Sequence, residues 1–311
     1  MMRAVRNTEQ GIRVVEVGSP QGQGIRLDVV SAGICGTDVG FAAGGVRGFT
    51  YGHEFAGIAA DGRGYFVEPT LYCGQCDQCH AGHVQRCTAA EHGHLGVYQD
   101  GGMTDAILVP EYTLLPLPDG LDARDACLVE PASVAWHGVR RANVSPGERL
   151  AVVGAGTVGL LAAAAARRTG HAVDVETRHP HQREAAERVE AGHPHGTYDV
   201  VIDAAGSESG LAKCTELARP GGRVVLLGVY PETVPIPSVV SLVKELTFVH
   251  AIAYGRHDGL RETGEAAAML ADNPDIAKGV ITHRFPLHDA PEAFRVAGDR
   301  ASGAIKVVLH P

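Results

Sequence analysis

Apolar and polar residues alternate in short runs through the first part of the chain. Residues 12–17 (IRVVEV) and 25–30 (IRLDVV) mix the two kinds with roughly a two-residue period, which predicts half-buried β-strands. Glycine and proline separate these runs at residues 18–20 and 22–24. A further apolar run at residues 106–109 is also strand-like. The pattern predicts that the chain opens with a small β-rich domain.

From residue 146 onward, strand-like apolar runs alternate with helix-like segments. The expected strands are residues 149–153, 172–177, 200–203, 223–228 and 246–251, and the expected helices are residues 158–168, 183–191 and 210–218. A bridging helix is expected at residues 128–139, and proline and glycine predict a turn at residues 220–222. This alternation is typical of an α/β domain with a doubly wound parallel sheet.

The longest apolar run, residues 150–166 (LAVVGAGTVGLLAAAAA), decides the interpretation of this second region. It is short for a membrane span, which needs about 20 apolar residues, and charged residues flank it on both sides. Its glycines favour a buried strand, a tight turn and a helix instead. Gly154 then permits the turn, Gly156 lets a pyrophosphate approach the backbone, and Gly159 lets the helix pack on the strand.

The start of that helix, at Thr157 and Val158, would face the phosphates with free N–H groups and the positive end of the helix dipole. A GxGxxG motif alone is weak in a chain with 40 glycines, so an ordinary strand–helix junction is the alternative. The placement between a strand and an alanine-rich helix favours dinucleotide binding.

Composition and charge narrow the class of protein. The chain has 311 residues, enough for two domains, and 45% of them are hydrophobic, which supports a packed core. A net charge of -9 gives no electrostatic support for nucleic-acid binding. The polar opening MMRAVRNTEQ is neither signal-like nor amphipathic. We therefore expect a cytoplasmic protein with neither a nucleic-acid nor a membrane partner.

Four of the seven cysteines are crowded into one loop, in the pattern Cys73-x2-Cys76-x2-Cys79-x7-Cys87. Four thiolates at short spacing are what a tetrahedral structural zinc site requires. An iron–sulfur site also takes four cysteines, though with other spacings, and is the alternative. Cys127 and Cys214 have no partners in the sequence and are expected to be small buried residues.

A second set of potential metal ligands precedes this loop. Cys35 stands in the segment GICGTD, and His53 stands in GHE. Zinc binds thiolate, imidazole and carboxylate, and a catalytic zinc keeps one position open for water or substrate. On these residues alone, a metal role and a packing role are equally open.

Taken in order, the motifs resemble those of the zinc-dependent medium-chain alcohol and polyol dehydrogenases. The motifs are GICGTD, GHE, the four-cysteine loop, Glu130-Pro131, the glycine turn and GAIKVV near the C-terminus. The resemblance spans nearly the whole chain. It implies a GroES-like β-rich catalytic domain from residues 1–130 and 254–311, with a structural zinc lobe at 73–87, and a Rossmann dinucleotide-binding domain at 131–253.

Carried over residue by residue, the resemblance assigns the catalytic zinc to Cys35 and His53. Glu54 stands where the family has a ligand or a close carboxylate neighbour of the metal. Glu130 stands where polyol and glucose dehydrogenases have a glutamate. Which of the two glutamates binds the metal at rest is open, since they can exchange.

The resemblance also assigns residues around the metal. Thr37 stands at the hydroxyl that hydrogen-bonds the substrate oxygen, and Asp38 is expected to hydrogen-bond the imidazole of His53. Three loop residues are candidates for the substrate cleft, although each alone is more often a surface or packing residue: His92, His94 and Tyr98.

Three departures from the family pattern stand out. Gly40 replaces a histidine that passes the proton to solvent in many relatives. Residues 59–66 shorten a strand pair, and residues 188–198 lack part of a strand–helix unit. None of these changes removes a metal ligand.

The end of the second expected Rossmann strand bears on the choice of nucleotide. An acidic residue there favours NAD, whereas an arginine can hold the phosphate of NADP. Arg178 falls closest to this position and favours NADP, while Glu176 leaves NAD open. Near the C-terminus, Lys306 stands where relatives place a basic residue near the pyrophosphate.

The expected activity is zinc-dependent oxidation of an alcohol, polyol or sugar, with hydride passing to NAD(P). Two zinc ions per chain and a homo-oligomer, dimer or tetramer, follow from the resemblance. Two alternatives are open at this point. One is a zinc-independent quinone or enoyl reductase of the same fold, and the other is a non-catalytic, zinc-stabilised binding protein.

Overall fold

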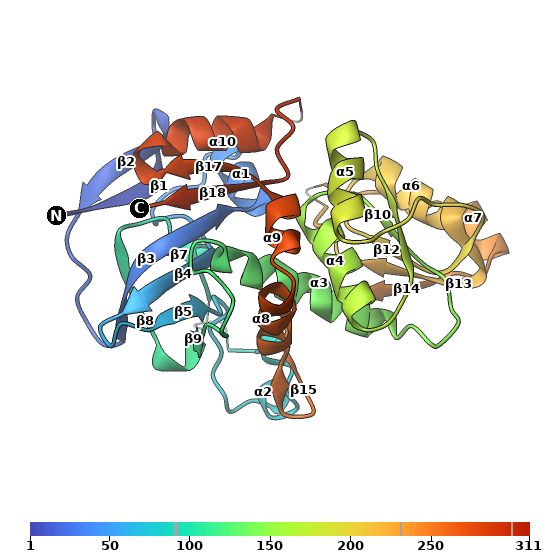
Figure 1. Cartoon of the computed structure of the whole chain (residues 1–311), viewed down its shortest axis with the longest axis horizontal. Helices are drawn as coiled ribbons and strands as arrows, with labels where there is room; N and C mark the ends of the chain where they lie inside the picture. The colour runs from blue at the N-terminus through green and yellow to red at the C-terminus, as the bar shows by residue number, and fades with distance from the viewer. Residues whose placement is uncertain (90–92, 231, 300) are drawn as a thin grey trace. The chain divides into compact units, whose positions relative to one another are not determined.

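The computed structural model describes residues 1–89, 93–230, 232–299 and 301–311, and the chain divides into two compact units (Figure 1). The first unit comprises residues Met1–Glu130, Gly255–Ala277 and Ile281–Pro311. The second comprises Pro131–Tyr254 and Lys278–Val280. Each unit has its own main sheet and its own hydrophobic core.

A long strand, β3 (Ile25–Ile34), organises the sheet of the first unit. The strand order is β17-β18-β3-β4-β5-β9, and β8 also pairs with β3. The bounds are β4 Glu54–Ala59, β5 Gly64–Val67, β8 Ala106–Val109, β9 Leu114–Pro116, β17 Ile281–Pro286 and β18 Lys306–His310. Leu27 and Val29 of β3 are buried, whereas Arg26 and Asp28 are exposed on its other face. The alternation in the sequence therefore buries one face of the strand.

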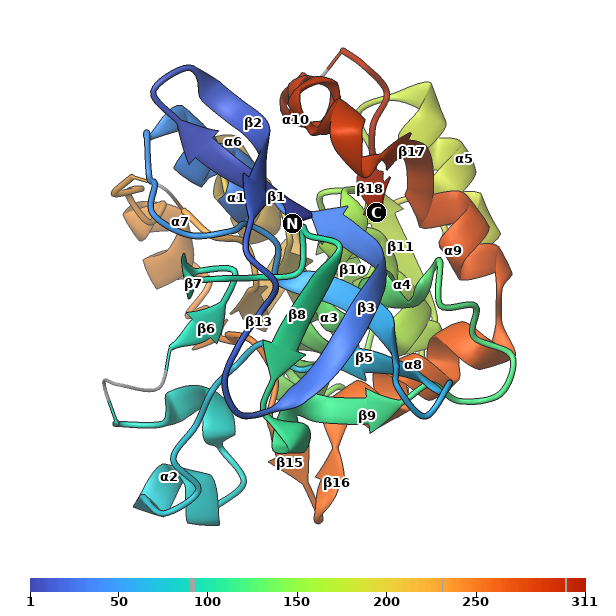
Figure 2. The same cartoon turned by 90° about the vertical axis from the view of Figure 1, so that its left-hand side faces the viewer.

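The two ends of the chain build this sheet together. β18 pairs antiparallel with β3 and brings Val307 opposite Ile34 and Leu309 opposite Ala32. In Figure 2 the C-terminal strands β17 and β18 are drawn in red at one end of the sheet. Strands β1 (Met2–Thr8) and β2 (Gly11–Val17) form a separate antiparallel hairpin.

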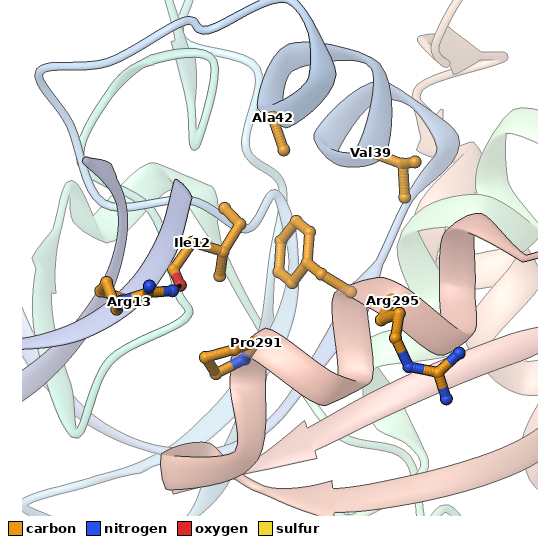
Figure 3. A pocket seen from close by; sticks show the side chains of 7 residues that line it. Ile12, Arg13, Val39, Ala42, Pro291 and Arg295 are labelled. Atoms are coloured by element: carbon orange, nitrogen blue, oxygen red, sulfur yellow. Dashed lines mark hydrogen bonds between the residues drawn. The ribbon is translucent and has the colours of Figure 1, made fainter. Parts of the chain in front are cut away.

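Helices α1 (Gly36–Ala43) and α10 (Ala290–Gly298) pack against each other in the first unit. Between them and β2 lies a pocket of about 290 Å³ whose lining includes Phe294. Figure 3 shows Ile12, Val39, Ala42 and Pro291 around this pocket, while the charged end of Arg295 points away from it. The described lining of this indentation beside α1 is apolar apart from Arg13 and Arg295.

The second unit contains a five-stranded parallel sheet in the order β11-β10-β12-β13-β14. The bounds are β10 Leu150–Val153, β11 Val173–Glu176, β12 Tyr198–Asp203, β13 Ala218–Leu226 and β14 Thr247–His250, with helices α4 Thr157–Arg168, α5 Pro180–Arg188, α6 Glu208–Leu217 and α7 Ser238–Val243. This is a doubly wound order with the outer strand next to β11 missing.

A remnant of the missing strand is present. An isolated parallel bridge joins Asp174 to Gly192. Gly192 accepts a hydrogen bond from the Val175 N–H at 3.0 Å and donates one to the Val173 carbonyl at 2.9 Å. The shortened segment at residues 188–198 has thus kept one point of strand pairing before the chain enters β12.

Several bounds differ from the expectations. Helix α5 begins at Pro180 rather than at residue 183, because a proline fits the first turn of a helix. The turn expected at residues 220–222 is wrong, since these residues lie within β13. The register shifts between Tyr198 and Val200, and Gly221 adopts a φ of 68°, so the Pro-Gly-Gly segment forms an irregularity inside the strand.

The remaining helices, turns and strands complete the fold. The helices are α2 Asp77–His80, α3 Val129–Ala142, α8 Glu262–Asp272 and α9 Asp275–Val280; the 3-10 turns are Val84–Arg86, Glu111–Thr113, Ala126–Leu128 and Leu287–Asp289; the strands are β6 His94–Leu95, β7 Tyr98–Gln99, β15 Arg256–His257 and β16 Leu260–Arg261. In the described parts of the chain, no helix is both long and apolar enough to cross a membrane.

Candidate active site

A cysteine, a histidine and a glutamate meet where β3 ends and β4 begins. Cys35 follows β3 and caps α1, and Glu54 opens β4 directly after His53. Because β3 and β4 are antiparallel, with Gly33 opposite Glu54, the chain between them returns beside Cys35. The ligand atoms of the three residues lie within 4.8 Å of one another. Sulfur, imidazole nitrogen and carboxylate at this spacing form a donor set that zinc accepts.

Asp38 links two of these ligands. One carboxylate oxygen accepts the N–H of Cys35 at 2.9 Å, and the other lies 3.6 Å from Nδ1 of His53. Both Asp38 and His53 are buried, and Nδ1 of His53 has no hydrogen-bond partner in the described structure. Burial lowers the pKa of His53, but the charges of Asp38 and Cys35 outweigh it and raise that pKa well above its usual value. The site therefore favours positive charge, which a bound metal ion supplies.

The carboxylate of Glu54 is held by Lys306. The Lys306 ammonium donates to both carboxylate oxygens, at 2.8 and 2.6 Å, and to the carbonyl of Ile34 at 3.0 Å. Burial lowers the pKa of Lys306, but the negative charge of Glu54 more than compensates and raises it. Lys306 is 3% exposed and all three of its N–H donors have acceptors. This differs from the expected pyrophosphate contact, because no donor of Lys306 is left for a phosphate.

Glu130 lies in the first turn of α3 and is also buried. Burial raises its pKa to about 7, and the negative charge of Glu54 adds to the rise, while the charges of His53 and Lys306 oppose it. Among the described residues, the close group of ligand atoms comprises Cys35, His53 and Glu54 without Glu130. The charges of His53 and Glu54 thus affect the pKa of Glu130, although Glu130 does not belong to the group of ligand atoms within 4.8 Å of one another.

Thr37 stands beside the candidate metal ligand. Its hydroxyl lies 3.8 Å from the sulfur of Cys35, and its side chain is half-buried. Gly36 and Gly40, on the same helix α1, are exposed. A hydroxyl next to the sulfur can hydrogen-bond an oxygen bound at the same centre, with solvent close along the helix.

The sulfurs of the four-cysteine loop also form a compact group. They lie within 4.8 Å of one another, with separations of 3.5 Å for Cys76–Cys79, 3.5 Å for Cys73–Cys87 and 4.0 Å for Cys73–Cys79. A zinc tetrahedron with zinc–sulfur bonds of about 2.3 Å has edges of about 3.8 Å. A cluster of several iron ions would hold four sulfurs further apart. The geometry therefore fits a single tetrahedral ion.

Backbone N–H groups support thiolates in this loop. The Thr88 and Cys79 N–H groups lower the pKa of Cys76 to about 5, whereas burial raises that of Cys79 to about 12. The N–H of Gln75 donates to the sulfur of Cys73 at 3.4 Å. Cys127 and Cys214 are buried and lie outside this group, as expected.

In the second unit, the glycine turn joins β10 to α4 as predicted. Gly154 has a φ of 104°, in the left-handed region that glycine favours. A β-carbon on Gly159 would collide with the carbonyl of Gly154, so the helix packs directly on the turn. A β-carbon on Gly156 would meet nothing within 4 Å, so the backbone there is open to a ligand. Thr157 and Val158 begin a 12-residue helix, whose N-terminal end suits a phosphate group.

Comparisons with known proteins agree with both sites. Residues 21–119 match the family model of the alcohol dehydrogenase GroES-like domain, and residues 157–271 match that of zinc-binding dehydrogenases. The chain is 30% identical to L-galactonate-5-dehydrogenase of Escherichia coli K12 over 310 residues, covering 90% of this chain and 89% of that protein. The chain belongs to the zinc-dependent medium-chain dehydrogenase family.

Other relatives extend the comparison. D-xylulose reductase A of Aspergillus oryzae is 29% identical, covering 92% of this chain and 88% of that protein. A structure from Sinorhizobium meliloti 1021, described as a zinc-binding dehydrogenase bound to NADP, is 30% identical with a TM-score of 0.85, covering 100% of this chain and 99% of that one. Galactitol-1-phosphate dehydrogenase from E. coli has a TM-score of 0.88 at 24% identity, covering 100% of each chain, which supports the fold alone.

These findings confirm the α/β fold class, with a Rossmann sheet and a GroES-like β-rich domain. The protein is a zinc-type dehydrogenase that oxidises alcohols with a nicotinamide dinucleotide. A zinc-independent reductase would not need Cys35, His53 and a glutamate together, so that alternative is set aside. The non-catalytic binding protein is set aside as well, because the named dehydrogenase and reductase relatives are enzymes.

In this dehydrogenase, Arg178 follows β11 and is exposed. Its guanidinium donates to the hydroxyl of Ser209 on α6 at 2.8 Å. Ser209 was not predicted from the sequence, because 31 residues separate it from Arg178 and only the parallel pairing of the strands brings the two ends together. The feature of the sequence that could have indicated Ser209 is a serine in the first turn of the helix that follows β12.

Two of the three loop residues proposed for the substrate cleft can be placed, whereas His92 lies outside the described residues. The His94 ring centroid is 5.8 Å from that of His53, and burial lowers the pKa of His94 to about 3, so its imidazole is neutral. Tyr98 is exposed, has a φ of 67°, and its ring contacts Phe41 at a centroid distance of 5.4 Å. His94 thus lies beside the metal ligands, and Tyr98 packs on α1.

Proposed function

We propose that the chain is an NADP-dependent polyol dehydrogenase that oxidises a secondary hydroxyl group at a zinc ion held in the first unit. The single observation that carries this proposal is the close group of Cys35, His53 and Glu54, braced by Asp38. Relatives named for a galactonate and for xylulose support a substrate rich in hydroxyl groups.

Cys35 and His53 hold the ion in this proposal, and Glu130 supplies the third protein ligand at rest. Glu54 is the weaker candidate because both of its oxygens accept hydrogen bonds from Lys306. When bound, zinc lowers the pKa of the alcohol, and the nicotinamide ring accepts the hydride. Exchange of Glu130 for Glu54 would require Lys306 to release one carboxylate oxygen.

Thr37 removes the proton from the hydroxyl group of the substrate. Its hydroxyl lies beside the sulfur of Cys35, so it is positioned to accept a hydrogen bond from the bound alcohol and to pass the proton onward. Gly40 is exposed and offers no side chain to relay that proton, so water along α1 carries it to solvent.

The cofactor is held by the second unit. Gly154, Gly156 and Gly159 shape the turn, and the N–H groups at Thr157 and Val158 bind the pyrophosphate. Arg178 and Ser209 bind the phosphate that distinguishes NADP from NAD, because guanidinium and hydroxyl donors suit a phosphate group. A related structure contains NADP, which supports this choice.

The four cysteines Cys73, Cys76, Cys79 and Cys87 hold a second, structural zinc ion that orders their loop. Thiolate sites and free cysteines suit a reducing compartment, which supports a cytoplasmic location. We also infer a homo-oligomer. Large apolar side chains of α7 are strongly exposed (Val239, 72%; Leu242, 77%; Val243, 77%), which favours burial against another copy of the chain.

The experiment is to follow the absorbance of reduced nicotinamide with zinc-loaded protein, with NADP or NAD, and with primary alcohols, secondary alcohols, polyols and aldoses. We expect reduction of NADP with polyols. The Cys35→Ser variant serves as the control and should be inactive. No reduction with any substrate would refute the proposal.

A further inference from the structure

A polar cavity of about 460 Å³ lies in the first unit, between the four-cysteine loop and the loop that carries His94. Its polar lining includes Thr70, Gln85, His94 and Gln99, and the rest is mostly aliphatic or glycine. Small-molecule sites commonly have volumes of about 300–1,000 Å³, so the cavity is large enough for an organic ligand.

Backbone hydrogen bonds fix the loop that carries His94. Leu71 N–H donates to the Gly93 carbonyl at 2.9 Å, and Leu95 N–H donates to the Pro69 carbonyl at 2.9 Å. A β-carbon on Gly96 would collide with the backbone of Gly52, next to the metal ligand His53. The loop therefore packs directly on the segment that carries the metal ligand, and the cavity wall is preformed.

His94 connects the cavity to the metal site. Its ring lies 5.8 Å from the ring of His53, and its Nδ1 is hydrogen-bonded to the Thr70 hydroxyl at 3.2 Å. A substrate whose reacting carbon is held at the metal has His94 within reach of its next carbons. This step rests on the proposed function.

The polar groups of the cavity suit hydroxyl groups. Two amide side chains, Gln85 and Gln99, and the imidazole of His94 line the cavity. An amide and an imidazole each offer both donors and acceptors, as a hydroxyl group does.

The cavity is poorly suited to anions. None of the described lining residues is a lysine or an arginine. Cys87, which also lines it, belongs to the four-cysteine group, whose four thiolates exceed the charge of one zinc ion. Burying a phosphate or carboxylate there without a cationic partner would be costly.

We propose that this cavity binds the hydroxyl-bearing end of a neutral polyol, the part of the substrate remote from the oxidised carbon. Thr70, Gln85, His94 and Gln99 are the residues that recognise it. The cavity selects long uncharged polyols over short alcohols, and over polyols that carry a phosphate at the remote end.

The test measures kcat/KM for sorbitol, 2-butanol and sorbitol 6-phosphate with zinc-loaded wild type, Gln99→Leu and Gln99→Lys. Wild type should prefer sorbitol to both other substrates. Gln99→Leu should lower the sorbitol-to-2-butanol ratio about fivefold, through loss of a hydrogen bond to the substrate. Gln99→Lys should raise kcat/KM for sorbitol 6-phosphate about fivefold or more, by supplying a cation. Gln21→Leu, at an exposed loop position, is the matched control and should leave the ratios unchanged.

The outcomes separate this proposal from the one on which it rests. A higher kcat/KM for sorbitol 6-phosphate in Gln99→Lys cannot come from misfolding. Dividing by kcat/KM for 2-butanol corrects the sorbitol values for any loss of active protein. If wild type oxidises these alcohols but Gln99→Leu and Gln21→Leu have equal ratios and Gln99→Lys shows no gain, the cavity proposal is overturned and the proposed function stands. If wild type oxidises neither sorbitol nor 2-butanol, both are wrong.

Discussion

Replacing Lys306 by methionine is the perturbation whose cost the structure defines best. The side chains of Lys306 and Glu54 are 3% and 2% exposed, and the shortest distance between their charged atoms is 2.6 Å. Lys306→Met removes the cation and leaves the carboxylate buried and unpaired. Breaking a buried ion pair in this way typically costs about 3–5 kcal/mol. We expect the free energy of unfolding to fall by that amount.

A second variant isolates the pair itself. Lys306→Met combined with Glu54→Gln removes both charges, so we expect it to be about 2 kcal/mol more stable than Lys306→Met alone. Lys213→Met is the matched control, because Lys213 forms an ion pair with Glu216 at 2.9 Å in which the Glu216 side chain is 67% exposed. That variant should change stability by no more than about 1 kcal/mol.

The assay is guanidinium-induced unfolding of the metal-free proteins, followed by circular dichroism, so that no zinc ion can pair with the Glu54 carboxylate. The reasoning is refuted if Lys306→Met costs no more than Lys213→Met. It is also refuted if adding Glu54→Gln does not increase the free energy of unfolding of Lys306→Met. The loss of stability would then not come from the unpaired Glu54 carboxylate.

Three further predictions concern the nucleotide, the buried glutamate and the four-cysteine loop. Arg178→Ala should raise the Kd for NADP by about tenfold to a hundredfold and that for NAD by less than about threefold, measured by fluorescence titration; equal losses would contradict the assignment of Arg178. The pKa of Glu130 is about 7 in the folded protein, against a usual 4.5. The metal-free protein should therefore lose about 3 kcal/mol of stability as the pH rises from about 4.5 to above about 7, as carboxylate formation favours unfolding. Glu130→Gln should remove this loss in pH-dependent unfolding curves, and an unchanged slope would contradict the assignment. Cys76→Ser should lower the zinc content by one ion per chain and increase hydrogen exchange in residues 73–87; full zinc retention would contradict a four-thiolate site.

Local sequence patterns were sufficient to predict those parts of the site whose residues are close in sequence. The four cysteines lie within one loop, so their spacing predicted the compact group of sulfurs that the structure contains. The glycine turn was equally local, because a strand, a turn and a helix follow one another directly. Cys35 and His53 are brought together by the β3–β4 pairing, which their distance in sequence alone did not specify.

Long-range pairing explains what the sequence did not predict. Lys306 and Glu54 are separated by 252 residues, and the pairing of β3 with both β18 and β4 brings the ammonium to the carboxylate. The family resemblance therefore placed Lys306 near the pyrophosphate, and nothing in the sequence indicated that Glu54 is its buried partner. The Pro-Gly-Gly segment at residues 220–222 has the composition of a turn, yet it forms an unpaired irregularity within β13, between the paired residues Ala218 and Arg223.

The central claim is that Cys35 and His53 hold one of two zinc ions and that this ion is required for alcohol oxidation. The most direct measurement is the zinc content and NADP-reducing activity of purified wild type and Cys35→Ser. We predict two zinc ions per chain in wild type, and one zinc ion with no activity in the variant. Two zinc ions or full activity in Cys35→Ser would contradict the account.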